Sequence, residues 1–321
     1  MNILLTGAAG FIGSHIADAL AHDPRVDRLT LLDNLSTGSI DNIRGLLDLP
    51  RVHFVEGDIR DYAVCLDACR QADRICHQAA LGSVPRSIEH PLNTHRHNAD
   101  GTLHLLEAAR QCGIKRFVYA SSSSVYGDNP ELPKREDRIG TPLSPYAVTK
   151  RANELYAQVF GRHYGMEPIG LRYFNIFGPR QSPQGPYAAV IPLFMKALIE
   201  GRAPRINGDG SISRDFTYVT NAVQANLRAL FTERAEACKQ IYNIACGSAI
   251  SLNELFAMLR EIAHSDLEPE HGPERPGDIA HSLADISLAR RFLDYAPAVG
   301  VREGLQTTFA WFAARHTPTS A

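Results

Sequence analysis

Short apolar runs alternate with longer segments of helical periodicity through the first half of the chain. Apolar residues recur every three or four positions in Phe11–Ala21 and in the segments DGTLHLLEAARQCG and YAVTKRANELYAQVFGRHYG, which predicts helices. The short runs have the length of strands and are Asn2–Thr6, Leu29–Asp33, Val52–Glu56, Arg74–His77, Phe117–Ala120 and Pro168–Arg172. Strands that alternate with helices predict an α/β fold, a doubly wound parallel (Rossmann) sheet covered by helices on both faces.

The pattern changes after Phe177. The segment FGPRQSPQGPY is rich in Pro and Gly, which indicates a loop, and shorter helical segments follow near residues 188–200, 221–231 and 252–263. We therefore expect a first domain over residues 1–177 and a smaller C-terminal α/β domain over residues 178–321, with elements of the two interleaved.

Composition and charge exclude several classes of protein. The 321 residues are 44% hydrophobic and carry a formal charge of −2, without the basic stripe of a nucleic-acid-binding protein. The first residues lack a basic segment followed by a longer apolar run, and no apolar stretch reaches the length of a membrane span, so we expect a cytoplasmic protein without membrane partners. The six cysteines form no CxxC pair, and we expect no metal site.

Glycines follow the first predicted strand in TGAAGFIGSH. Gly7, Gly10 and Gly13 have the spacing that lets a chain turn tightly while a pyrophosphate approaches a helix N-terminus, although a purely structural turn is the alternative. Asp33 ends the second strand, where a carboxylate accepts from ribose hydroxyls and repels a 2′-phosphate, which favours NAD over NADP. Asp58 ends the third strand and is either an adenine contact or a helix N-cap.

A second group of polar residues predicts proton chemistry. Tyr146 and Lys150, in SPYAVTK, are four positions apart and share one face if this segment is helical. A nearby ammonium favours the phenolate of tyrosine, so Tyr146 is a candidate proton acceptor. The strand ending in YASSSSVYGD places hydroxyls where open α/β sheets bind ligands, although a polar loop is the alternative.

Taken together and in this order, the motifs resemble a known superfamily. TGAAGFIGSH, LLDNLSTG, GDIRD, HQAA, YASSSSVYGD, SPYAVTK, LRYFNIFGP and SRDFTYV are similar to the extended short-chain dehydrogenases/reductases, and within them to the nucleotide-sugar 4-epimerases. The resemblance covers residues 1 to about 312. QAALGSVPRSIEHP, PYAAVIP and GDIAHSLADIS point to the bacterial UDP-N-acetylglucosamine 4-epimerases of surface-polysaccharide synthesis.

The resemblance implies a mechanism for these residues. Tyr146 takes the proton of the sugar 4-hydroxyl, directly or through a serine, while a hydride moves from C4 to bound NAD. The 4-keto sugar then presents its other face and the hydride returns. Lys150 lowers the pKa of the tyrosine and holds the nicotinamide ribose. Counting back from the tyrosine of VYG selects Ser122 as the catalytic serine, and a shift of one residue would select Ser123.

The resemblance also implies two sets of binding residues. Those for NAD are Gly7, Gly10, Phe11, Ile12, Gly13, Asp33, Asn34, Ser36, Thr37, Gly38, Asp58, Ile59, Gln78, Ala79, Ala80, Asn98, Ser121, Tyr146, Lys150 and Tyr173. Those for the UDP-sugar are Gly82, Ser83, Ser122, Ser123, Tyr146, Asn175, Ala189, Val190, Arg214, Arg275, Asp278 and Ser282. The two arginines would grip the diphosphate, because a guanidinium presents a fork of donors that matches phosphate oxygens.

The size of residues at the expected pocket positions predicts which substrate the protein takes. Ser123 and Ser124 stand where related dehydratases and decarboxylases carry carboxylates, which disfavours both reactions. Small residues at Gly82, Ala189 and Ser282 leave room for an N-acetyl group, so UDP-N-acetylglucosamine is the expected substrate and UDP-N-acetylgalactosamine its product. UDP-glucose and UDP-N-acetylglucosaminuronic acid are the alternatives.

Two further expectations concern the class of protein and its assembly. A non-catalytic dinucleotide-binding module is the alternative class, and the intact Tyr146–Lys150 pair disfavours it. Relatives form homodimers by pairing helices, here residues 98–111 and 145–163, so we expect a homodimer. The outer apolar residues of these helices could serve either the interface or the sheet, and they include Leu103, Leu106, Leu155 and Val159.

Overall fold

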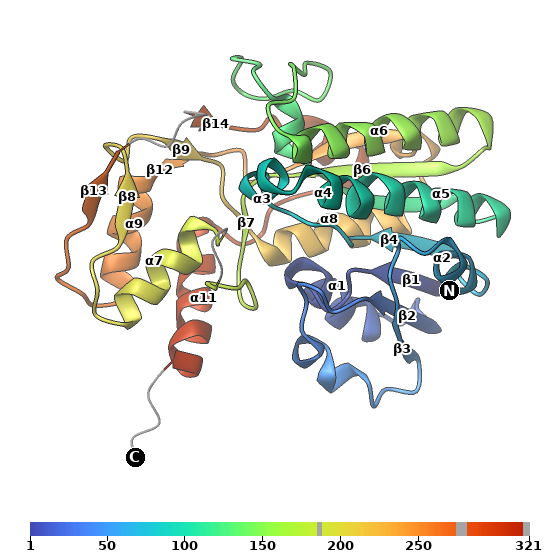
Figure 1. Cartoon of the computed structure of the whole chain (residues 1–321), viewed down its shortest axis with the longest axis horizontal. Helices are drawn as coiled ribbons and strands as arrows, with labels where there is room; N and C mark the ends of the chain where they lie inside the picture. The colour runs from blue at the N-terminus through green and yellow to red at the C-terminus, as the bar shows by residue number, and fades with distance from the viewer. Residues whose placement is uncertain (185–187, 274–280, 317–321) are drawn as a thin grey trace.

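A central parallel sheet organises the molecule (Figure 1). The computed structural model describes residues 1–184, 188–273 and 281–316. Within these ranges seven strands pair in the order β11-β6-β5-β4-β1-β2-β3. Their bounds are β1 Asn2–Thr6, β2 Arg28–Asp33, β3 Val52–Glu56, β4 Arg74–His77, β5 Arg116–Ser122, β6 Glu167–Tyr173 and β11 Gln240–Ile244. The predicted doubly wound α/β fold is confirmed, and all six predicted strands are present, with β5 and β6 running slightly further than predicted.

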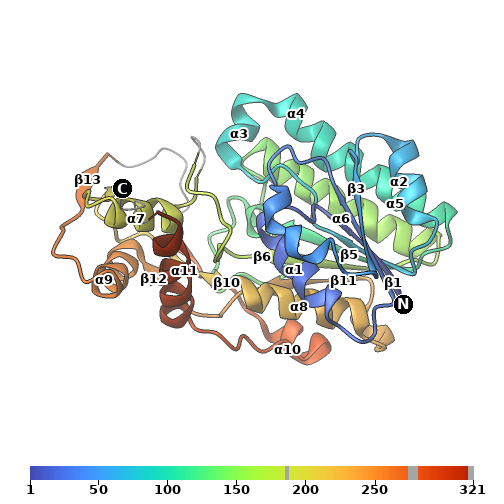
Figure 2. The ribbon, with the colours of Figure 1, turned by 90° about the horizontal axis from the view of Figure 1, so that it is seen from below.

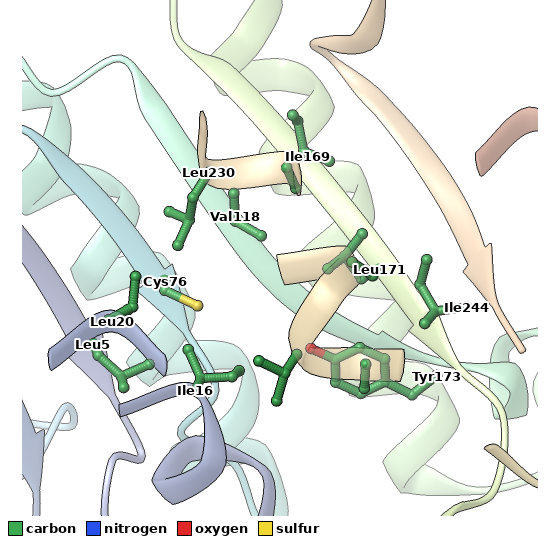
Figure 3. Close-up of a cluster of buried hydrophobic side chains, with 14 of the residues drawn as sticks. Leu5, Ile16, Leu20, Cys76, Val118, Ile169, Leu171, Tyr173, Leu230 and Ile244 are labelled. Carbon is green, nitrogen blue, oxygen red and sulfur yellow. The ribbon is translucent and has the colours of Figure 1, made fainter. Parts of the chain in front are cut away.

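Helices cover both faces of the sheet, as Figures 1 and 2 show together. One face carries α2 (Tyr62–Cys69), α5 (Gly101–Gln111) and α6 (Pro145–His163), and the other carries α1 (Phe11–Ala21) and α8 (Val219–Phe231). Successive strand residues point to opposite faces, and accordingly Leu4 packs in the cluster under α5 while Leu5 packs in the cluster under α1. Figure 3 shows the second cluster, where side chains of α1, the strands and α8 meet.

One strand of the central sheet was not predicted. β11 pairs in parallel with β6, with Gln240 opposite Ile169 and Ile244 opposite Tyr173. Its sequence, QIYNI, is short and has little amphipathic signal of its own, so pairing with β6 decides its conformation. β11 and α8 both come from beyond residue 177. The central sheet and its helices therefore include segments from both sides of residue 177.

The remaining elements form a smaller lobe beside the sheet, which Figure 2 shows away from the N-terminus of β1. A separate core holds Phe194, Met195, Phe256, Leu259 and Phe312. Its helices are α7 (Val190–Ile199), α9 (Leu252–Ile262) and α11 (Val301–His316), and its short strands are β7 (Ile176–Phe177), β8 (Arg205–Asn207), β9 (Ser213–Arg214), β10 (Thr217–Tyr218), β12 (Ile250–Ser251), β13 (Glu270–Gly272) and β14 (His281–Ser282). The predicted helices of this region correspond to α7, α8 and α9.

Short helices complete the fold between β4 and α5 and near the C-terminus. They are α3 (Val84–Glu89), α4 (Pro91–His95), a π-helical turn at Arg96–Asp100 and α10 (Ser287–Leu293). Among the described residues, no helix combines the length and the apolar character needed to span a bilayer.

Candidate active site

The glycine loop between β1 and α1 forms a cradle. Gly7 has φ of 69°, and a Cβ placed there would lie 2.5 Å from the backbone nitrogen of Ala79. A Cβ on Gly13 would lie 1.9 Å from the Gly7 carbonyl oxygen, so a side chain at either position would displace the loop. α1 begins after Gly10 without a side-chain cap. Its first N–H groups and the positive end of its dipole are therefore free to bind an anion.

Acidic and polar residues stand at the ends of β2 and β3. Asp33 is buried, and its Oδ2 accepts the backbone N–H of Ala9 at 2.9 Å. Asp58 pairs with Arg60 at 2.7 Å and accepts Asn34 Nδ2 at 2.8 Å, and hydrogen bonding from Arg60 holds the pKa of Asp58 far below its usual range. The N-cap of α2 is Asp61, so the N-cap interpretation of Asp58 is wrong.

A cavity of about 480 Å³ opens along these strand ends. The predicted NAD residues that line it are Gly7, Gly10, Phe11, Ile12, Gly13, Asp33, Asn34, Ser36, Thr37, Ile59, Gln78, Ala79, Ala80, Ser121, Tyr146, Lys150 and Tyr173. Gly38, Asp58 and Asn98 lie outside this lining. Gly38 packs against the backbone of Ala9, and the Asn98 side chain bonds the backbone N–H and carbonyl of Leu81. These two residues support the cavity wall from behind.

The candidate catalytic residues meet where β5 ends and α6 begins. Ser122 is the last residue of β5, and its hydroxyl accepts the backbone N–H of Ser124 at 3.1 Å. α6 starts after its N-cap Ser144 and places Tyr146 and Lys150 one turn apart on the cavity side. The Lys150 Nζ atom lies 5.9 Å from the centroid of the Tyr146 ring.

Burial governs the ionisation of this pair. Burial lowers the pKa of Lys150 to about 8, against the attraction of Glu154, and its Nζ donates to the Ala120 carbonyl at 2.9 Å. Burial raises the pKa of Tyr146, and a hydrogen bond with Ser122 acts in the opposite direction. We expected Lys150 to lower the pKa of Tyr146. In the structure, the group that lowers this pKa is Ser122.

The four serines of YASSSSVYGD have different surroundings. Ser121 is buried and donates to Glu154 Oε1 at 2.6 Å, while Ser122 lines the cavity and bonds Tyr146. Ser123 is not part of the cavity lining and stands in a 3-10 turn, Ser123–Tyr126. The geometry therefore favours Ser122 over Ser123 as the serine beside Tyr146.

A second cavity of about 280 Å³ adjoins the first and shares Asn175, Ile176 and Gln181 with it. Of the predicted UDP-sugar residues, Asn175, Ala189, Val190 and Arg214 line it. Sequence reasoning missed Arg205 and Asn207, which also line this cavity. The available signal was their position immediately before the Gly-rich turn GDG.

The other predicted sugar residues lie elsewhere. Gly82 lines the first cavity, while Ser83 caps α3 by accepting the Arg86 backbone N–H at 3.2 Å. Ser282 on β14 is opposite Arg214 in the pairing of β14 with β9 but does not line either cavity. Arg275 and Asp278 lie outside the described residues.

The first cavity fits a dinucleotide. The Gly7–Gly13 cradle has no room for side chains and presents a free helix N-terminus for a pyrophosphate. Asp33 offers a carboxylate at the end of β2, and Tyr146 and Lys150 stand at the far end of the same cavity. Fold and site thus define an enzyme of the dinucleotide-dependent Rossmann class. The chain belongs to the NAD dependent epimerase/dehydratase family, whose family model matches residues 3–245.

Several relatives share this fold and length. The UDP-glucose 4-epimerase of Mycolicibacterium smegmatis is 37% identical over 97% of this chain and 98% of its own length. A UDP-N-acetylglucosamine 4-epimerase from Methanobrevibacter ruminantium, solved with UDP-N-acetylmuramic acid, is 39% identical with a TM-score of 0.92 over 98% of each chain. A UDP-glucuronic acid 4-epimerase from Bacillus cereus, solved with UDP-glucuronic acid and NAD, is 30% identical with a TM-score of 0.91 over 98% of this chain and 100% of that one.

These findings confirm the predicted membership of the nucleotide-sugar epimerases within the extended short-chain dehydrogenases/reductases, and NAD as the cofactor. The three relatives agree in their reaction, 4-epimerisation of a UDP-sugar, and differ in the sugar that each is named for.

Proposed function

We propose that the protein interconverts UDP-N-acetylglucosamine and UDP-N-acetylgalactosamine by reversible epimerisation at C4 with bound NAD. One observation carries the proposal: Ser122, Tyr146 and Lys150 line a dinucleotide cavity that shares the wall residues Asn175 and Gln181 with a second cavity, and arginines line that second cavity. A nucleotide sugar can place its diphosphate in the second cavity and its hexose at the junction, next to the hydroxyls.

The side chains at the junction perform proton transfer. When bound, NAD supplies the acceptor that takes a hydride from C4 and gives it back. Tyr146 takes the proton of the 4-hydroxyl, directly or through Ser122, and returns it to the other epimer. A positioned acid–base group of this kind contributes about 10²–10⁴-fold to the rate. Lys150 remains cationic beside the tyrosine and is held in place by the Ala120 carbonyl.

Arg214 and Arg205 in the second cavity fit a diphosphate, since guanidinium groups bind phosphate oxygens through paired donors. By the family resemblance, Arg275 would also bind the diphosphate and Asp278 would accept from the uridine ribose. Asn175 has φ of 39° and its Nδ2 donates to the Asp215 carbonyl at 3.1 Å, which fixes its amide at the point where the two cavities meet.

Small residues support the choice of an N-acetylated sugar. Nothing lies within 4 Å of a Cβ built on Gly82, and Ala189 is the small residue where the second cavity meets α7. Ser282 is next to Arg214 in the β14–β9 pairing. Differences of this size in a pocket are worth about 1–3 kcal/mol, which gives a preference over UDP-glucose and UDP-N-acetylglucosaminuronic acid rather than their exclusion.

The experiment incubates the purified protein with UDP-N-acetylglucosamine, UDP-glucose and UDP-N-acetylglucosaminuronic acid in parallel and follows the C4 configuration by proton NMR. Fastest conversion of UDP-N-acetylglucosamine supports the proposal. Faster conversion of another sugar would keep the mechanism and overturn the substrate, and no conversion with NAD supplied would overturn both. In Gly82→Val, which would fill space in the first cavity, the ratio of UDP-N-acetylglucosamine to UDP-glucose turnover should fall, and this ratio is its own control.

A non-catalytic dinucleotide-binding module is the competing class. Tyr146→Phe separates the two classes, because it should abolish turnover and leave NAD bound.

We also propose a homodimer that pairs α6 with its copy. The structure separates the apolar residues of these helices: Leu106 is fully buried against the sheet and Leu103 packs beside the same core, whereas Leu155 and Val159 are 46% and 47% exposed. Leu92 on the neighbouring α4 is 73% exposed. Together these residues make an apolar face that a second copy would cover.

A further inference from the structure

A buried carboxylate stands directly behind the candidate catalytic residues. Glu154 is one turn beyond Lys150 on α6, and its side chain is 0% exposed. It accepts Ser121 Oγ at 2.6 Å from β5 and Arg151 Nη1 at 2.9 Å from its own helix. From β6, Arg172 donates Nε at 2.8 Å and Nη2 at 3.0 Å. One side chain thus binds the ends of two strands to α6.

The strand register connects this carboxylate to the site. Ser121 is opposite Arg172 in the pairing of β5 with β6, and Ser122 is opposite Tyr173. The two strand residues bound by Glu154, Ser121 and Arg172, therefore immediately precede residues that line the dinucleotide cavity. A displacement of Ser121 or Arg172 would be passed on to Ser122 or Tyr173 through a single peptide unit.

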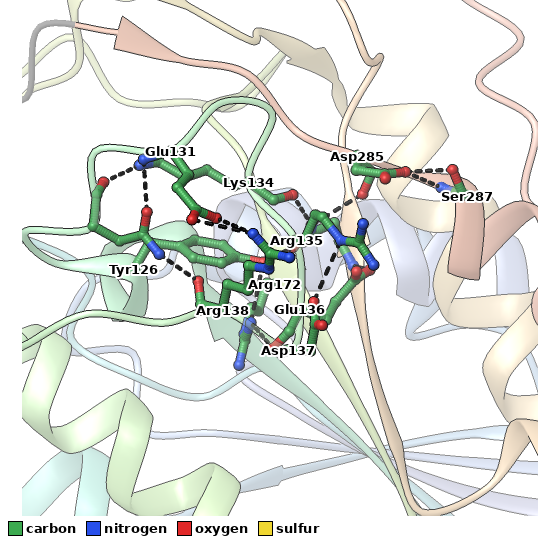
Figure 4. Close-up of polar contacts among 12 residues, drawn as sticks. Tyr126, Glu131, Lys134, Arg135, Glu136, Asp137, Arg138, Arg172, Asp285 and Ser287 are labelled. Atoms are coloured by element: carbon green, nitrogen blue, oxygen red, sulfur yellow. Dashed lines mark hydrogen bonds and ion pairs between the residues drawn. The ribbon is translucent and has the colours of Figure 1, made fainter.

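The Arg172 guanidinium is bound on its far side as well, as Figure 4 shows. Its Nη1 donates to Tyr126 Oη at 3.0 Å and to the Glu136 carbonyl at 3.1 Å, and Tyr126 donates to Asn243 on β11 at 2.6 Å. Taking such an ion pair out of water costs several kcal/mol, and apolar residues of similar volume often stabilise a core equally well. Stability alone therefore gives little reason for this pair at this place.

We propose that Glu154 is a positioning residue for epimerisation, which holds Ser121 and Arg172 so that Ser122 and Tyr173 line the dinucleotide cavity and which favours the cationic form of Lys150. The inference rests on the roles proposed above for Ser122, Tyr146 and Lys150. Glu154 attracts the Lys150 ammonium and so opposes the effect of burial on its charge.

Charged and titratable groups surround both Lys150 and Glu154. Lys150 interacts with Glu154 on α6 and with His77 on β4, and its ammonium lies near the Tyr146 ring. Around Glu154 are Arg151 on α6, Arg172 on β6 and Tyr119 on β5. Among the residues that the structure describes, Glu154 is the carboxylate that acts on Lys150, so removing its negative charge should let Lys150 lose its proton at lower pH.

The test compares Glu154→Gln with a matched control, Glu167→Gln. Arg116 on β5 and Glu167 on β6 form another ion pair, at 2.9 Å, which lies at the opposite ends of these strands from Ser121 and Arg172. Each substitution removes the carboxylate partner of an arginine whose side chain is less than one tenth exposed. Glu154→Gln should lower kcat at least tenfold with KM changed about threefold or less, and should shift the alkaline fall of kcat to lower pH by about one unit. Glu167→Gln should keep kcat within about twofold.

A double variant separates positioning from stability. Glu154→Gln/Arg172→Met removes both charges, so its midpoint of urea unfolding should recover relative to Glu154→Gln, while kcat should stay low. Recovery of kcat together with stability would overturn the inference, as would a Glu154→Gln variant whose kcat and pH profile match those of Glu167→Gln. The double variant decides the question even if Glu154→Gln alone folds poorly.

Tyr146→Phe, assayed alongside, shows whether a negative result concerns the role of Glu154 or the proposed function as a whole. An active Tyr146→Phe enzyme would overturn the proposed catalytic roles. An inactive one, together with a Glu154→Gln variant that behaves like the control, would overturn the role of Glu154 alone.

Discussion

The Asp33 carboxylate at the end of β2 accepts the backbone N–H of Ala9 in the glycine loop, with 2.9 Å between Oδ2 and N. Its other oxygen accepts the backbone N–H of Leu35 at 2.8 Å. The carboxylate therefore fixes the loop after β1 and the turn after β2 relative to one another. Each oxygen keeps a lone pair for a ribose hydroxyl, so one side chain both shapes the site and binds at it.

Asp33→Asn should weaken NAD binding about tenfold or more, because hydrogen bonds to a charged group are worth about 1.5–3 kcal/mol. The same change removes the repulsion of a 2′-phosphate, so the ratio of NAD to NADP affinity should fall. Isothermal calorimetry with both nucleotides measures this. Asp41→Asn, on an exposed turn away from the cavity, is the control, and equal losses in the two variants would contradict the role of Asp33.

Ser122→Ala should reduce kcat about 10²-fold or more, whereas Ser123→Ala should stay within a few-fold of the unaltered enzyme. The reason is that Ser122 lines the cavity and bonds Tyr146, while Ser123 begins the following 3-10 turn. Steady-state turnover of the best UDP-sugar measures both. The reverse order of losses would transfer the catalytic role to Ser123.

His77 should make the protein sensitive to acid. The imidazole is buried, with Nδ1 2.7 Å from Thr6 Oγ1 and Nε2 2.9 Å from Thr102 Oγ1. Thr102 donates its hydroxyl proton to the Asn98 carbonyl, so its oxygen accepts the Nε2–H of His77. Burial, aided by the Lys150 charge, lowers the pKa of His77 to about 3.

Because the unfolded chain binds a proton at this histidine below about pH 6.5 and the folded protein does not, stability should fall as the pH drops from 6.5 toward 3. At pH 5 this difference in proton binding should lower the free energy of unfolding by about 2 kcal/mol. Urea unfolding at pH 7.5 and pH 5 should show this loss diminished in His77→Gln and unchanged in His22→Gln, an exposed control. An undiminished loss in His77→Gln would show that other groups cause the acid sensitivity.

Leu155→Glu should convert the proposed dimer to monomers. Burying this exposed leucine in the interface should stabilise the dimer by about 1.5–3 kcal/mol. The substitution removes that stabilisation and places two like-charged glutamates opposite each other in the interface. Sedimentation equilibrium should give twice the chain mass for the unaltered protein. Leu288→Glu on α10, 36% exposed and outside the α6 face, should remain dimeric. A monomeric unaltered protein would contradict the assembly.

Much of the fold was predictable because its signals are local. Strands buried on both faces are continuous apolar runs, and the helices between them keep a period near 3.6, so β1 to β6 were placed nearly to the residue. Sequence spacing also decided part of the site. Residues four apart on one helix must share a face, which brings Tyr146 next to Lys150 regardless of what packs around them.

Other features depend on pairing between distant segments. β11 carries no strong pattern and becomes a strand because β6 offers it an edge. Arg205 and Asn207 reach the second cavity because β8 folds back beside Asn175, which is about 30 residues earlier in the chain. Counting back from the tyrosine of VYG left Ser123 as an alternative to Ser122, and the structure ends β5 at Ser122, which lines the cavity.

The sequence by itself determined the alternating architecture, the glycine loop, Asp33 at the end of its strand and the Tyr146–Lys150 face, since each follows from residues close together in the chain. Only the tertiary structure decided between Ser122 and Ser123 as the serine beside Tyr146, how burial sets the ionisation of Lys150, and that Glu154 on α6 meets Arg172 on β6. These properties depend on dehydration and on contacts across the sheet, and both arise only when segments distant in sequence exclude water together.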